Sequence, residues 1–143
     1  MTPVLTVDLR SLPELAAQLP DVRALCLYVD SPRGGFDAAT VVRMSEAQAA
    51  AGIAGGKPFA LARVEVPPEV FRALGDEGPL GALYTLLRQA EGRALGVPFL
   101  LQQDAPEAAP GFVLEAKAET LGLNLGDAGK LFMFVDHAFW ESA

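Results

Sequence analysis

Residues 123–136 read Leu-Asn-Leu-Gly-Asp-Ala-Gly-Lys-Leu-Phe-Met-Phe-Val-Asp, and this stretch says more about the fold than any other part of the chain. Two glycines, Gly126 and Gly129, mark a tight turn that leads directly into an alternating aromatic strand. A glycine-containing turn next to alternating apolar residues is a strong local signal for a β-hairpin. The stretch therefore predicts a hairpin in the middle of a sheet.

A second segment resembles the strand part of this stretch. Residues 24–30 (Ala-Leu-Cys-Leu-Tyr-Val-Asp) match residues 130–136 (Lys-Leu-Phe-Met-Phe-Val-Asp) in their apolar pattern and in their final aspartate. The match has two explanations, a duplication that gives two related β-layers or a chance similarity between apolar strands.

The remaining chain alternates short strands with short helices. Periodicity predicts strands at 4–7, 40–42, 59–66, 99–103 and 112–120, and helices at 11–19, 45–51, 68–74 and 80–91. For residues 37–51 a helix capped by Asp37 is an alternative, but the β-branched Thr40, Val41 and Val42 favour a strand before an alanine-rich helix. Gly92 to Pro98 is expected to be a break. The pattern predicts one α+β domain over residues 1–143, with mainly antiparallel curved sheets, a few short helices and, under the duplication alternative, pseudo-twofold symmetry.

The amino-acid composition argues against some classes of binding partner. The 143 residues include 51% hydrophobic residues, enough for one domain with a real core. Eighteen acidic and eleven basic residues give a net charge of -7, which repels nucleic acids and anionic lipid surfaces, so neither partner is expected. The single cysteine, Cys26, cannot form an intrachain disulfide and fits a reducing compartment. The first residues carry no secretory signal pattern, and a cytoplasmic location is expected.

The sequence contains no recognisable catalytic constellation, so we do not expect an enzyme or a cofactor. The only histidine, His137, lies beside Asp136, but neighbours on a strand point to opposite faces. One histidine and one cysteine do not supply the ligands of a zinc site. Gly55-Gly56-Lys57 resembles a phosphate-binding loop, but Pro58 stands where a hydroxyl would contact magnesium.

Four residues are the candidates for binding: Gln102, Asn124, Asp127 and Trp140. Gln102 follows an apolar run and suits a groove that orients a ligand, although a solvated loop residue has the same pattern. Asn124 and Asp127 either present polar groups to a ligand or bond their own turn. Trp140, the only tryptophan, either packs in the core or anchors a partner.

Three segments of the second half resemble the YwqG-like family, a bacterial domain of unknown function. They are Leu-Gly-Val-Pro-Phe-Leu-Leu-Gln at 95–102, Phe-Val-Leu-Glu-Ala at 112–116 and Asn-Leu-Gly-Asp-Ala-Gly-Lys-Leu-Phe at 124–132. They are similar to that family's Leu-Gly-x-Pro-x-x-x-Gln element, its following strand and its Gly-Asp-x-Gly-x-Leu-x-Phe hairpin, in the same order. The family's histidine before the first element would fall at Gly92, so an activity that depends on it is not expected.

The resemblance implies a mixed α+β fold and, through the association of relatives with bacterial toxin and immunity neighbourhoods, a role in protein binding. Together with the charge of -7, it predicts a non-enzymatic binding module for a basic partner protein, with a toxin as one candidate. The alternative is a small-molecule binder or weak enzyme with a groove near Gln102, Asn124 and Asp127. A homodimer formed through the strand at 59–66 is a third alternative.

Overall fold

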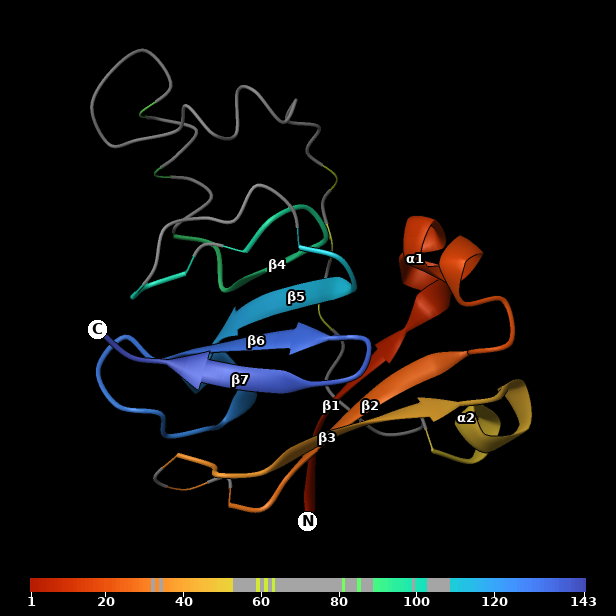
Figure 1. The fold of residues 1–143 in the computed structure, drawn as a ribbon, viewed down its shortest axis with the longest axis horizontal. Coiled ribbons are helices and arrows are strands. Elements are labelled where there is room, and N and C mark those ends of the chain that lie inside the picture. Colours follow the sequence, from red (N-terminus) through yellow and green to blue (C-terminus); the bar gives the residue numbers. More distant parts are fainter. Residues whose placement is uncertain are drawn as a thin grey trace.

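Two antiparallel sheets and a few short helices form the part of the chain that the structure describes (Figure 1). The structure is a computed structural model that describes residues 1–31, 33, 35–52, 59, 61, 63, 81, 85, 89–98, 100–102 and 109–143. One sheet has the order β1 (Thr2–Asp8), β2 (Ala24–Val29), β3 (Ala39–Met44). The other has the order β4 (Gly92–Ala94), β5 (Phe112–Lys117), β6 (Lys130–Phe134), β7 (Ala138–Glu141). The helices are η1 (Leu9–Ser11), α1 (Pro13–Gln18), α2 (Glu46–Gly52) and η2 (Glu119–Leu121).

The inner faces of the two sheets share one hydrophobic core. Side chains alternate along each strand, so every second residue of β2 and β6 points inward. The members from these two strands are Leu25, Leu27, Val29, Leu131 and Met133, all fully buried. This core confirms the predicted α+β class, because apolar stripes from both sheets need each other for burial.

The two sheets contain the same structural unit. In β1-β2-β3 and in β5-β6-β7 the first strand is followed by a 3₁₀-helix, and the middle strand pairs with both of its neighbours in antiparallel fashion. The registers also correspond: Asp8 pairs with Ala24 in one unit, and Lys117 pairs with Lys130 in the other. The similar segments 24–30 and 130–136 thus begin at the same position of equivalent central strands.

Two further details repeat between the units. The first strand of each unit has a register shift near its start, at residues 3–5 in β1 and at residues 112–114 in β5, and such bulges bend a sheet. The residue after each first strand also donates its backbone N–H to the residue before the middle strand, in the pairs Leu9 to Arg23 and Ala118 to Gly129. These shared details are those that the duplication alternative predicts, and antiparallel pairing of similar strands also produces them.

The prediction of a hairpin within residues 123–136 is wrong, because the residues before the turn do not pair with the strand after it. The turn at 126–129 does lead into β6, and β6 is an interior strand, but it pairs with β5 and β7 rather than with residues 123–125. Leu123 and Leu125 are buried in the core, and Asn124 between them forms an isolated parallel bridge with Arg33. Because Leu123 and Leu125 are buried in the core, residues 123–125 do not lie alongside β6 as a paired strand.

Other expected elements have mixed outcomes. Strands β2, β3 and β5 and helix α2 lie where the pattern predicted them, whereas β4 occupies part of the expected break. Residues 101–102 form a bend instead of the predicted strand, and the described residues at 59, 61 and 63 belong to no strand. The predicted helix at 68–74 and most of the one at 80–91 lie outside the described residues. Among the residues described, no helix is both long and apolar enough to cross a membrane.

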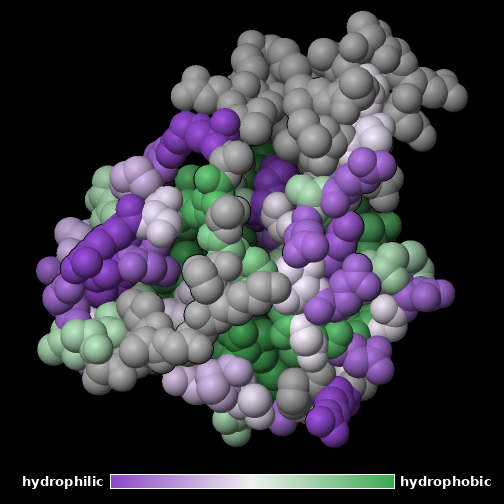
Figure 2. Space-filling view, turned by 180° about the vertical axis from the view of Figure 1, so that it is seen from behind, coloured by the Kyte–Doolittle hydropathy of each residue, from purple (hydrophilic) through white to green (hydrophobic). Residues whose placement is uncertain are grey.

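Seen from behind, the surface divides into polar flanks and a more apolar middle. Hydrophilic side chains gather on the flank that carries α1 and α2 in Figure 1, and hydrophobic side chains are visible along the middle of the view (Figure 2). Cys26 is not part of this surface, since it is buried and accepts a hydrogen bond from the Thr6 hydroxyl at 3.4 Å.

Candidate functional site

Two of the four predicted binding residues, Gln102 and Asp127, contact residues 142–143. The Gln102 side-chain amide donates to the backbone oxygen of Ser142 at 3.0 Å, and the backbone N–H of Ala143 donates to the Asp127 carbonyl at 3.1 Å. Asn124 lies in the same turn as Asp127 and accepts a 3.5 Å bond from the Gly126 N–H on its own Oδ1. The fold thus brings the Gln102 side chain and the backbone of the Asp127 turn to the same two residues, 142 and 143.

A buried carboxylate holds Gln102 in this place. Glu141 is only 5% exposed, and its Oε2 accepts the backbone N–H groups of Leu101 at 2.6 Å and of Gln102 at 3.2 Å. Hydrogen bonds to a charged acceptor are stronger than neutral ones, so the segment is fixed at both backbone and side chain. Gln102 consequently has a clear structural role in positioning the loop against β7.

Trp140 is separate from that group and joins the two sheets. Its ring packs against the core from β7, and its indole Nε1 donates to the backbone oxygen of Phe36 at 3.1 Å. Gly35 lies beneath the ring, because a Cβ on this glycine would lie 2.9 Å from Trp140 Cζ2. The tryptophan therefore fixes the loop between β2 and β3 against the second sheet.

Two loops from different sheets form one end of the molecule. The Gly35 N–H donates to the Asn124 carbonyl at 3.0 Å, which joins the β2–β3 loop to the loop before β6. Both loops lie beside each other in Figure 1, below the strands of the second sheet. Three exposed aspartates lie on them, and we call these the acidic loop face: Asp30, Asp37 and Asp127. Within the described part of the chain, no basic side chain forms an ion pair with any of the three.

A buried charge network on the outer face of the second sheet was not predicted. Glu115 of β5 is 4% exposed and lies 3.3 Å from Arg93 Nη2 on one oxygen and 3.2 Å from Lys130 Nζ on the other. Burial lowers the pKa of the Arg93 guanidinium, and the Glu115 carboxylate opposes that shift. Arg93 also donates to the Val97 carbonyl. The sequence does contain one sign of this network, a glutamate inside the apolar strand Phe-Val-Leu-Glu-Ala-Lys. A charged side chain that is buried in such a strand requires a partner of opposite charge.

Aromatic rings form a row next to this network. Phe132 stacks on Phe139 with ring centroids 5.1 Å apart, and Phe134 stacks on His137 at 4.4 Å. His137 also bonds the Asp136 carboxylate at 2.6 Å from Nδ1, and this hydrogen bond holds the pKa of Asp136 below its ordinary value. Both side chains are exposed, so the pair has no buried general base and resembles a surface ion pair.

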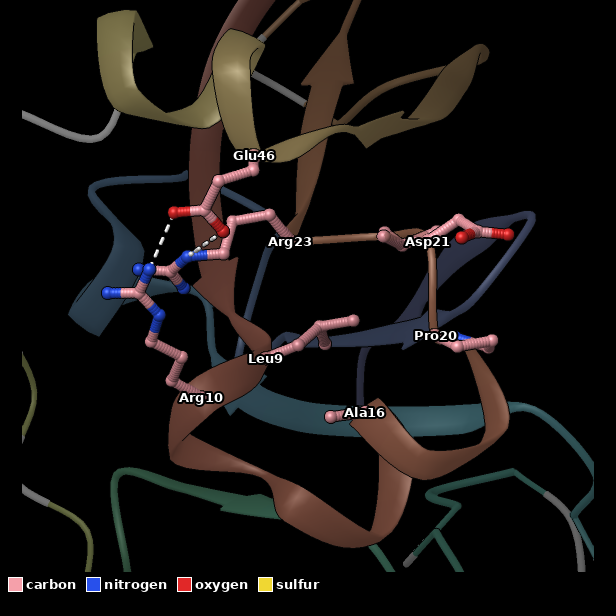
Figure 3. Close-up of a pocket in the computed structure, with 8 residues that line it drawn as sticks. Leu9, Arg10, Ala16, Pro20, Asp21, Arg23 and Glu46 are labelled. Carbon is pink, nitrogen blue, oxygen red and sulfur yellow. Dashed lines mark hydrogen bonds and ion pairs between the residues drawn. The ribbon is translucent and has the colours of Figure 1, made fainter.

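A small pocket of about 230 Å³ lies on the opposite sheet, between η1, α1 and the start of α2 (Figure 3). Four of its lining residues are apolar, namely Leu9, Ala16, Pro20 and Val22, and the other four are charged. Arg10 and Arg23 lie at one end and both contact Glu46. Asp21 lies at the other end, and its carboxylate points away from the two guanidinium groups in Figure 3.

Metal-binding side chains do not gather in the described ranges, where no group of three His, Cys, Asp or Glu residues has suitable geometry. Asp30, Asp127 and Asp136, which a carboxylate-only calcium site would have to bring together, form no such group. Asp104, a fourth aspartate that such a calcium site could use, lies outside the described residues.

Comparison with known proteins gives no match to a family model, to a curated protein or to a solved structure. The likeness to the YwqG-like family therefore rests on the resemblance of sequence segments alone. Function has to be argued from the surfaces and contacts described above.

Proposed function

We propose that this chain is a non-enzymatic binding module of the cytoplasm that docks a basic partner protein on the acidic loop face. The observation that carries the proposal is the hydrogen bond from Gly35 to Asn124, which holds loops of both sheets together and so places their exposed aspartates on one end. The net charge of -7 adds a long-range attraction for a basic surface.

The charge on this face is available to a partner. Among the described residues, the Asp30 side chain bonds the neighbouring Ser31 N–H at 2.9 Å, and no cation forms an ion pair with Asp30, Asp37 or Asp127. Arg33 is also exposed on the β2–β3 loop, so the three aspartates and this arginine give the face a net charge of about -2. Complementary charges of this kind increase the association rate and reject partners of like charge. A partner with clustered Lys and Arg side chains is therefore favoured over an acidic one.

The face is also held in one shape before binding. Trp140 bonds Phe36 in one loop, and Ala143 bonds Asp127 in the other. A surface that is ordered in the free protein loses less conformational entropy when it binds. The resemblance to the YwqG-like family supports a toxin as the basic partner, within the same proposal.

Affinity capture from an extract of the native cells tests this function at low and moderate salt. The immobilised wild-type chain is compared with the triple variant D30N/D37N/D127N and with the control triple D21N/E91Q/D136N, which changes the net charge equally at exposed sites elsewhere. We expect the wild type and the control to retain the same basic protein in a salt-sensitive manner and the loop-face triple to lose it. Equal retention by all three chains would contradict the proposal.

A small-molecule site near Gln102, Asn124 and Asp127 is the second candidate. The contacts of Gln102 and Asp127 with residues 142–143 favour it, since they bring polar groups of three segments together. Asp127→Ala removes the only one of these side chains that carries a charge. Thermal-shift screening of metabolites should then give a ligand whose effect is lost in this variant, and an unchanged shift would remove Asp127 from the site.

A further inference from the structure

Two arginines in the pocket of Figure 3 already bind a carboxylate, and that carboxylate comes from the chain itself. Arg10 Nη2 lies 2.5 Å from Glu46 Oε1, and Arg23 Nε lies 3.1 Å from Glu46 Oε2. Each carboxylate oxygen therefore has its own guanidinium partner. The Arg10 contact is a hydrogen bond, whereas the Arg23 Nε contact is an ion pair without hydrogen-bond geometry.

The charges around the two arginines are balanced only when one carboxylate in addition to Asp8 is bound to them. Arg23 is largely buried and also contacts Asp8, whose Oδ1 accepts the Arg10 backbone N–H at 2.9 Å. Asp8 therefore offsets one of the two positive charges, and Glu46 offsets the second. Without Glu46 the pair would have a net positive charge at the end of the pocket that is opposite Asp21.

Glu46 is a weakly held occupant. Its side chain is 67% exposed and that of Arg10 is 66% exposed, and ion pairs exposed to this degree contribute little stability. Helix α2 has other attachments: Ala49 is buried, and Ser45 and Gln48 form a reciprocal capping box with contacts of 2.9 and 3.4 Å. The carboxylate can thus leave the arginines while the helix stays in place.

We propose that Arg10 and Arg23 form a binding site for a small monocarboxylic acid with a short aliphatic tail, and that Glu46 occupies this site when the ligand is absent. The carboxylate of the ligand replaces that of Glu46, and its tail enters the pocket against Leu9 and Ala16. A volume of about 230 Å³ corresponds to roughly eight water-sized groups, which matches an acid of about six carbons. This site is independent of the acidic loop face and of its partner.

Hexanoate is the probe, with hexanamide and acetate as controls for the charge and for the tail. Binding is measured by NMR titration, with the backbone amides and the arginine Nε–H signals as reporters. We expect hexanoate to shift the Arg10 and Arg23 signals of the wild type, while acetate binds more weakly and hexanamide does not bind. Glu46→Gln should raise the affinity for hexanoate about fivefold, because it removes the internal competitor.

Arg10→Gln removes one of the two guanidinium groups that would bind the carboxylate of the ligand, and it should lower the affinity for hexanoate about tenfold. Arg63→Gln is the matched control, since Arg63 is a similarly exposed arginine that pairs with Glu14 outside the pocket. Its affinity should equal that of the wild type. The proposal is overturned if hexanamide binds as well as hexanoate, if the Arg10 and Arg23 signals of the wild type do not move, or if Glu46→Gln leaves the affinity unchanged.

Discussion

The indole Nε1 of Trp140 donates a hydrogen bond of 3.1 Å to the backbone oxygen of Phe36, and this contact links the last strand of one sheet to the loop between β2 and β3 of the other. Gly35 leaves the space that the tryptophan ring occupies. The shape of the acidic loop face depends on this link, because Asp30 and Asp37 lie at either end of the same loop.

Trp140→Phe should lower the free energy of unfolding by about 1–3 kcal/mol. The phenyl ring retains much of the packing, but the Phe36 carbonyl loses its donor. Urea denaturation followed by circular dichroism measures the change, and Phe59→Leu, at an exposed position, is the control. A loss no larger than that of the control would show that the hydrogen bond contributes nothing.

Gly129→Ala should cost about 3 kcal/mol, because the new Cβ would lie 2.6 Å from the Leu125 carbonyl oxygen and the backbone would have to move. Gly122 is the matched control at a helix end. Its φ of +70° is strained for alanine, but a Cβ there meets nothing within 4 Å, so Gly122→Ala should cost only about 1 kcal/mol. Equal losses in urea denaturation would contradict the close packing of the turn before β6.

Glu115→Gln should destabilise the protein far more than Glu46→Gln. Both carboxylates contact two cationic side chains, but the Glu115 side chain is 5% exposed and that of Glu46 is 67% exposed. Removing a charge from a buried network costs about 3–5 kcal/mol, whereas an exposed ion pair contributes at most about 1 kcal/mol. Guanidinium denaturation of the two variants would contradict this interpretation if their midpoints were the same.

The Asp136–His137 pair should contribute a small stability that depends on pH. The pKa of Asp136 in the folded protein lies below its ordinary value because His137 bonds it. A carboxylate with a lowered pKa stabilises the fold above its unfolded pKa of about 4 and loses this contribution as the pH falls through the lowered value. An NMR titration should show the Asp136 pKa rise in His137→Gln, and an unchanged pKa would contradict the contact.

Sequence patterns were sufficient for β2 and β6, whose apolar residues alternate, but not for 59–66, where the described residues 59, 61 and 63 belong to no strand. Leu25 and Leu27 in β2 and Leu131 and Met133 in β6 point to one core, and this alternation is visible in the sequence. The similarity of the two segments also anticipated the repeated unit. Strand β4 could not be predicted, because three residues with an exposed glycine carry no periodic signal.

The candidate site depended on contacts that no local pattern contains. Trp140 and Phe36 are 104 residues apart, and Gln102 and Ser142 are 40 apart. The glycines predicted the turn at 126–129 correctly. The path of the residues before this turn could not be predicted, because it depends on the burial of Leu123 and Leu125 in the core. Tertiary packing therefore placed Asn124 beside Gly35, where the two loops meet.

The central claim is that the acidic loop face binds a basic protein. Its most direct test is calorimetric titration of the captured partner with three chains: the wild type, D30N/D37N/D127N and the control triple D21N/E91Q/D136N. The proposed docking predicts that the loop-face triple weakens binding at least about tenfold and reduces its salt dependence, while the control triple stays close to the wild type. Equal affinities of the two triples would show that only net charge matters and would contradict a docking surface on these loops.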